Sequence, residues 1–143
     1  MKTLYETTVH VTGGRDGAAR SDDGKLDVGL ALPKALGGSG TGSNPEQLFA
    51  AGFGACFNSS LRHAARTMGH DAGAVTVDAT VWLVRAEDGA FGIAARLAVD
   101  LPGLAPADRD GVIAEAKRIC AYTNATRGNV AVEVAVVGAE EAA

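Results

Sequence analysis

Two cysteines, Cys56 and Cys120, are the side chains of this sequence most suited to covalent chemistry. The nucleophile is the thiolate, and a free cysteine with a pKa near 8.5 is only a few per cent ionised at neutral pH. Burial raises that pKa further, because an apolar environment disfavours the charged form. Lowering the pKa by about two units takes about 2.7 kcal/mol of preferential thiolate stabilisation. A reactive Cys56 therefore needs a cation beside it.

Arg15 is the candidate cation, and Glu46 is the candidate group that holds it. Arg15 lies in a glycine-flanked turn, 13–17, and a desolvated guanidinium both stabilises a thiolate and polarises a bound substrate with its fork of donors. Glu46 could hold that fork in a bidentate pair. Two plainer interpretations stay open: a solvated turn arginine, and a carboxylate favoured by the dipole at a helix start.

The spacing between Glu46 and Cys56 limits how these groups can meet. Ten residues separate them, which is roughly 15 Å along a straight helix. They cannot touch within one helix. Either Arg15 bridges them, or Glu46 approaches from an antiparallel helix of a second subunit.

Both cysteines also fit a packing role, since free cysteine is among the most buried residue types. The polar run that follows Cys120, residues 122–129, favours an ordered loop with a task. A surface turn would have a similar composition.

The helix that must carry Cys56 has clear boundaries. Asn44 suits the N-cap, Pro45 the first helical position and Gly69 the stop, so the sequence predicts a helix that runs on to Met68. Its first half, LFAAGFGACF, is apolar on every side. Such a helix is expected inside the protein or in a subunit interface.

The remaining pattern predicts strands and one further helix. Residues 3–11 are rich in Thr, Val and Tyr, residues 25–32 alternate, and a glycine-rich loop follows over 33–43. Residues 75–85 and 91–101 form a predicted hairpin around Asp88-Gly89. Pro106 opens the second helix, which carries Cys120 near its end, and 130–137 is the last strand. We expect a single α+β domain over residues 1–143.

Composition restricts the classes of partner. The chain has 143 residues, a formal charge of −4 and a pI near 5.3, which gives no basic surface for nucleic acid or an anionic membrane. No apolar run of about 18 residues and no secretory signal are present, so we expect a cytoplasmic location, where thiols stay reduced. The histidines lack metal-ligand spacing with the cysteines, and neither a metal nor another cofactor is expected.

Two segments carry a resemblance to a known family. Residues 44–57, NPEQLFAAGFGACF, and residues 120–129, CAYTNATRGN, are similar to the two cysteine segments of the Ohr (organic hydroperoxide resistance) subfamily of the OsmC/Ohr thiol peroxidases. The similarity covers essentially the whole chain. One departure is Ala121, where the family usually has proline.

The resemblance implies a fold and a reaction. The fold would be the OsmC-like α+β fold, with antiparallel strands around a long buried central helix in an intertwined homodimer whose active sites lie at the subunit boundary. Cys56 would attack an organic hydroperoxide and become a sulfenic acid, which Cys120 would condense to a disulfide. Arg15 and Glu46 match the activating pair. Dihydrolipoamide, often on a lipoylated protein, would be the reductant.

An apolar pocket formed by Phe49, Phe53 and Phe57 would favour alkyl, aryl or lipid peroxides over hydrogen peroxide. Other functions remain open from the residues alone. These are an OsmC-type peroxidase of broader specificity, a dimer that binds a small apolar ligand and uses its cysteines for packing, and a structural interaction protein.

Overall fold

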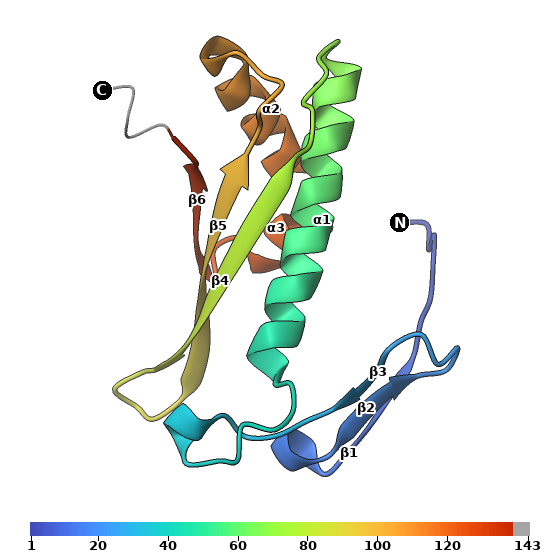
Figure 1. Ribbon diagram of the computed structural model, residues 1–143, viewed down its shortest axis with the longest axis vertical. Coiled ribbons are helices and arrows are strands. Elements are labelled where there is room, and N and C mark those ends of the chain that lie inside the picture. The colour runs from blue at the N-terminus through green and yellow to red at the C-terminus, as the bar shows by residue number, and fades with distance from the viewer. Residues whose placement is uncertain (139–143) are drawn as a thin grey trace. The chain divides into compact units, whose positions relative to one another are not determined.

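The computed structural model describes residues 1–138, and these divide into two compact units, Met1–Leu48 and the part that starts at Phe49 (Figure 1). The elements together make an α+β fold, as the sequence predicts. That the chain forms a single domain stays a prediction. Among residues 1–138, no helix is both long and apolar enough to cross a membrane.

The N-terminal unit is built on a three-stranded antiparallel sheet. Its strands are β1 (Val9–Thr12), β2 (Ala18–Ser21) and β3 (Asp27–Gly29), in the order β1-β2-β3. The prediction of a strand over 3–11 is wrong for its first six residues. Pairing begins only at Val9, because β2 offers four partners, from Ser21 to Ala18.

The C-terminal unit contains a mixed sheet. Strands β4 (Thr76–Arg85) and β5 (Phe91–Asp100) form the predicted hairpin, with Arg85 opposite Phe91. Strand β6 (Ala131–Val136) pairs with β5 in parallel, so the prediction of antiparallel strands is wrong for this pair. A parallel neighbour requires a crossover connection, and here helices α2 (Pro106–Ile119) and α3 (Ala121–Thr126) supply it.

Helix α1 (Pro45–Thr67) begins at the predicted residue and ends one residue before the predicted end, Met68. The Asn44 side chain accepts a 2.9 Å hydrogen bond from the Gln47 amide, which satisfies one of the free donors at the helix start. The helix is not buried on every side within the chain, because Ala51 and Ala55 are exposed. The buried residues of α1, among them Phe53, Phe57 and Leu61, lie on one face of the helix.

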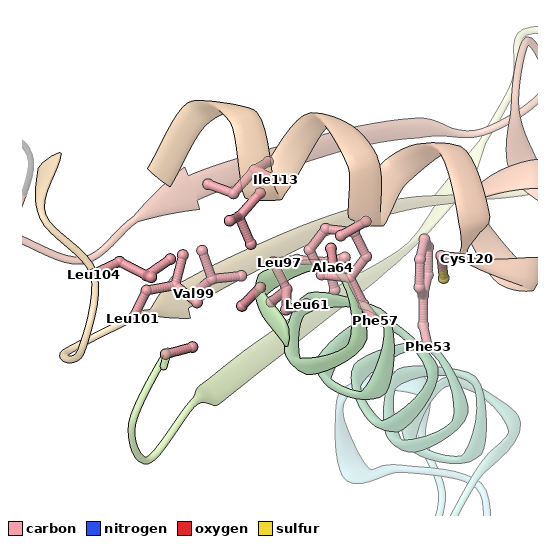
Figure 2. Close-up of a cluster of buried hydrophobic side chains, with 14 of the residues drawn as sticks. Phe53, Phe57, Leu61, Ala64, Leu97, Val99, Leu101, Leu104, Ile113 and Cys120 are labelled. Atoms are coloured by element: carbon pink, nitrogen blue, oxygen red, sulfur yellow. The ribbon is translucent and has the colours of Figure 1, made fainter. Parts of the chain in front are cut away.

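That face closes the hydrophobic core of the C-terminal unit. Figure 2 shows Phe57 and Leu61 of α1 in one cluster with Leu97 and Val99 of β5 and Ile113 of α2. Phe57, Leu61 and Val99 are fully buried. The core therefore packs α1, which contains Cys56, and α2, which ends at Cys120, against the sheet.

Candidate active site

Cys56 lies on α1, three residues after Phe53 and one before Phe57. Both phenylalanines are fully buried, whereas the Cys56 side chain is partly exposed. Ser60, one turn further on, donates a 3.0 Å hydrogen bond to the Cys56 carbonyl. The packed neighbours hold the backbone at Cys56, and the thiol stays open to a reactant.

Cys120 is the junction between two helices. It ends α2 and precedes α3, with extended backbone angles of φ −69° and ψ 122°. Its side chain is fully buried, beside Phe53 in Figure 2. The prediction of a loop over 122–129 is wrong for the first half, because the chain restarts a helix at Ala121 once the extended residue has broken α2.

The two thiols are brought together although 64 residues separate them. The Sγ atoms of Cys56 and Cys120 lie 3.4 Å apart, and both cysteines are free. A disulfide bond is about 2.05 Å long. The two sulfur atoms are thus in contact, and a small movement of the side chains would bring them to the length of a disulfide bond.

The pKa of Cys56 is raised, chiefly by burial, and the adjacent Cys120 adds to this effect. The backbone amides of Tyr122 and Ala121 oppose it, since they favour the thiolate. At Cys120 burial also disfavours ionisation, but hydrogen bonds from the amide and hydroxyl of Thr123, together with those from Cys56 and the Tyr122 amide, lower the pKa.

These opposite directions belong to one coupled pair. Ionising either sulfur disfavours ionisation of the other, so the first proton leaves the pair as a whole. For Cys56 the result is a pKa above its ordinary value, because burial of the thiol outweighs the effect of the Tyr122 and Ala121 amides. Within the C-terminal unit, the groups that favour its thiolate are amides rather than a cation.

Arg15 and Glu46 form a bidentate ion pair in the N-terminal unit. The guanidinium donates hydrogen bonds of 2.8 and 2.7 Å to the two carboxylate oxygens. The Glu46 side chain is 16% exposed and that of Arg15 36% exposed. Hydrogen bonding to Arg15 lowers the pKa of Glu46, although burial works against it. The pair is therefore charged at neutral pH.

The turn that carries Arg15 depends on glycine. Gly13 has a φ of +69°, and a Cβ built on Gly17 would lie 1.8 Å from the Thr12 carbonyl oxygen. Asp16 fixes the other side of the turn, because its carboxylate accepts a 3.0 Å hydrogen bond from the Leu32 amide. The 3-10 helix Gly14–Asp16 thus presents Arg15 from a constrained backbone.

The phenylalanines of the predicted pocket differ in their surroundings. Phe49 is half-buried, whereas Phe53 and Phe57 belong to the core. Phe49 and Phe53 pack edge to face, with ring centroids 5.8 Å apart. The third aromatic ring against them is that of Tyr122, at 6.1 and 5.7 Å.

Tyr122 and Thr123 were not among the residues predicted from the sequence. Both lie in the polar run after Cys120, which the composition marks as functional without naming a residue. Their contacts with the sulfurs depend on α3, a helix of six residues that is too short to leave a periodic pattern.

No group of three or more His, Cys, Asp or Glu side chains within residues 1–138 is arranged to hold a metal ion.

Comparisons with known proteins agree with the fold. The model of the family described as OsmC-like protein matches residues 38–135, and the chain belongs to this family. It is 42% identical over 131 residues to an organic hydroperoxide resistance protein of Xanthomonas axonopodis pv. citri (strain 306), covering 90% of this chain and 92% of that one.

Solved structures give the same result. An organic hydroperoxide resistance protein from Elizabethkingia anophelis superposes with a TM-score of 0.90 at 41% identity, covering 95% of this chain and 98% of that one. The organic hydroperoxide resistance protein OhrB of Bacillus subtilis gives 0.83 at 38% identity, with coverages of 94% and 99%.

Proposed function

We propose that this protein is a cysteine-based peroxidase that reduces organic hydroperoxides to alcohols. The Cys56 thiolate attacks the terminal peroxide oxygen, the O–O bond breaks, and the alkoxide takes up a proton and leaves as the alcohol. Cys56 is then a sulfenic acid. The Cys120 thiol attacks it, forms the Cys56–Cys120 disulfide and releases water. A dithiol such as dihydrolipoamide, free or on a lipoylated protein, restores both thiols by exchange.

One observation carries this proposal: two free thiols, one on α1 and one at the junction of α2 and α3, lie 3.4 Å apart. A merely structural cysteine needs no second sulfur in contact. A sulfenic acid does need one, because rapid condensation protects it from irreversible oxidation. The names of the relatives, organic hydroperoxide resistance proteins, support the choice of oxidant.

The Arg15–Glu46 pair fits the role of activator. Burial raises the pKa of Cys56, so nucleophilic attack at neutral pH requires a compensating positive charge. Arg15 carries such a charge on a constrained turn, and Glu46 fixes the orientation of its donors. We infer that the guanidinium stabilises the thiolate and orients the peroxide oxygens.

We also infer a homodimer. Ala51 and Ala55 are exposed although they lie in the apolar stretch of α1. Their small side chains would allow a helix of a second subunit to approach closely. Of the predicted pocket residues, the half-buried Phe49 is proposed to supply apolar surface for the organic group of the substrate, with Phe53 and Phe57 packed in the core behind it. The reaction needs thiols that are kept reduced, as in the cytoplasm. No metal or other cofactor enters it.

Intact mass after one equivalent of tert-butyl hydroperoxide tests the proposal. Wild-type protein should lose the mass of two hydrogen atoms and regain it with dihydrolipoamide. Cys120→Ser should instead gain one or more oxygen atoms, because its sulfenic acid has no partner thiol. Cys56→Ser should do neither. An unchanged wild-type mass would refute the proposal.

A further inference from the structure

Tyr122 lies against α1 in a way that only glycine permits. A Cβ built on Gly52 would be 2.6 Å from the phenol oxygen and 3.0 Å from Cζ of Tyr122. Real Cβ atoms do not approach this closely, so any side chain at position 52 would displace the ring. The bare backbone of Gly52 therefore provides the seat for the Tyr122 ring.

This seat adjoins Cys56. Residues three and four apart share one face of a helix, and Gly52 and Phe53 are the fourth and third residues before Cys56. The Tyr122 ring contacts both of them. The Tyr122 amide acts on the sulfur itself, since it favours the Cys56 thiolate. Tyr122 thus borders the space next to the thiol on the side of the helix start.

The ring also remains available for contact. The tyrosine is 37% exposed, whereas Phe53 beneath it is fully buried. Its other aromatic neighbour, Phe49, is half-buried. Because Phe53 is fully buried, an apolar group that approaches Cys56 from this side would meet Tyr122 before it could reach Phe53.

We propose that Tyr122, seated on Gly52, is a specificity-determining residue: its ring binds the organic part of the hydroperoxide. The inference rests on the proposed peroxidase function. A hydroperoxide with an alkyl or aryl group gains this apolar contact, and hydrogen peroxide does not. Tyr122 therefore raises kcat/KM for organic hydroperoxides without taking part in cleavage of the O–O bond.

The test compares cumene hydroperoxide with hydrogen peroxide as substrates of the full-length protein. Loss of an apolar contact of this size changes discrimination by about tenfold. Tyr122→Ala should lower the ratio of the kcat/KM for cumene hydroperoxide to that for hydrogen peroxide by about that factor. Tyr122→Phe should retain the ratio, because the ring remains.

Gly52→Ala gives a second route to the same result, because its methyl group displaces the ring. Gly54→Ala is the matched control. It is the same substitution in the same helix, but its Cβ meets only Ala79 at 3.5 Å, an ordinary contact. We expect the ratio to fall in Gly52→Ala and to stay unchanged in Gly54→Ala, and thermal unfolding reports whether each variant is folded.

The outcomes separate the inference from the function on which it rests. A parallel loss of both kcat/KM values in Tyr122→Ala, or no change in either, would overturn the role of Tyr122 while leaving the peroxidase intact. An equal fall in Gly54→Ala would do the same. Wild-type protein that consumes neither peroxide would overturn the proposed function and the inference together.

Discussion

The guanidinium of Arg15 donates two hydrogen bonds, of 2.8 and 2.7 Å, to the carboxylate of Glu46, which lies 31 positions later in the sequence. One partner lies in the β1–β2 turn and the other in the first turn of α1. The planar fork of arginine matches the two carboxylate oxygens, which fixes the orientation of the guanidinium as well as its distance. This orientation gives the first two predictions.

Removal of the cation should make Cys56 less acidic. In a Cys120→Ser background, Arg15→Ala is expected to raise the midpoint of the pH profile of Cys56 alkylation, by up to about two pH units. Arg15→Lys should raise it less, because a point charge remains. Arg20→Ala is the control, since Arg20 is exposed on the neighbouring strand β2. An unchanged midpoint in Arg15→Ala would exclude Arg15 as the activator.

Glu46→Gln should cost stability only above the pH range in which Glu46 is protonated. Arg15 lowers the pKa of Glu46 below its usual 4.5, so the pair contributes fully above that value and its contribution is lost as the pH falls through the lower, folded-state pKa. With Arg15 36% exposed, we expect a loss of about 0.5–1 kcal/mol at neutral pH. Thermal unfolding should show this difference vanish in strong acid. A constant difference at all pH values would contradict the charged pair.

Ala121→Pro should raise the pKa of Cys56 slightly without unfolding α3. Ala121 is the first residue of α3, where proline is well tolerated, but proline has no amide hydrogen to favour the thiolate. One lost hydrogen bond of this kind is worth about 1 kcal/mol, or somewhat under one pH unit in the alkylation midpoint. Ala121→Ser keeps the amide and should leave the midpoint in place. A shift of the same size in both variants would show that the amide of residue 121 is not responsible.

Gly17→Ala should disrupt the turn that carries Arg15. Its Cβ would collide with the carbonyl oxygen of Thr12, a backbone atom that cannot move aside, so we expect a loss of about 2 kcal/mol or more. Gly29→Ala, in β3 of the same sheet, meets no atom within 4 Å and should be tolerated. Limited proteolysis of the two full-length variants, with cleavage sites in the first 48 residues identified by mass spectrometry, would compare them. Equal protection in both variants would contradict this account of the turn.

The sequence predicts the parts of the fold that local signals define. The N-cap at Asn44, the proline at the start of α1 and Asp88-Gly89 in the hairpin each determine their own neighbourhood. The helix α3 and the parallel pairing of β6 leave no such signal, because the first is too short and the second depends on contacts far apart in the chain.

In the candidate site, too, some features follow from the local sequence and others depend on contacts between distant residues. The residue types at Cys56, Cys120, Arg15 and Glu46 suggest chemistry, and the predicted Arg15–Glu46 pair is present. The position of the Tyr122 ring could not be predicted, since it depends on the absence of a side chain at Gly52, on a helix that three other elements separate from α3. A missing Cβ becomes informative only when the opposite surface is known.

The 64-residue separation between the two sulfurs has a consequence for how the protein resists unfolding. A covalent link over a loop of that length restricts the unfolded chain and stabilises the native state by about 4 kcal/mol in the chain-entropy treatment. Under the proposed reaction, exposure to the oxidant would therefore convert the protein into its more durable form. Its resistance to denaturation would therefore be greatest while organic hydroperoxide is present. The reductant would return the protein to the less stable dithiol form.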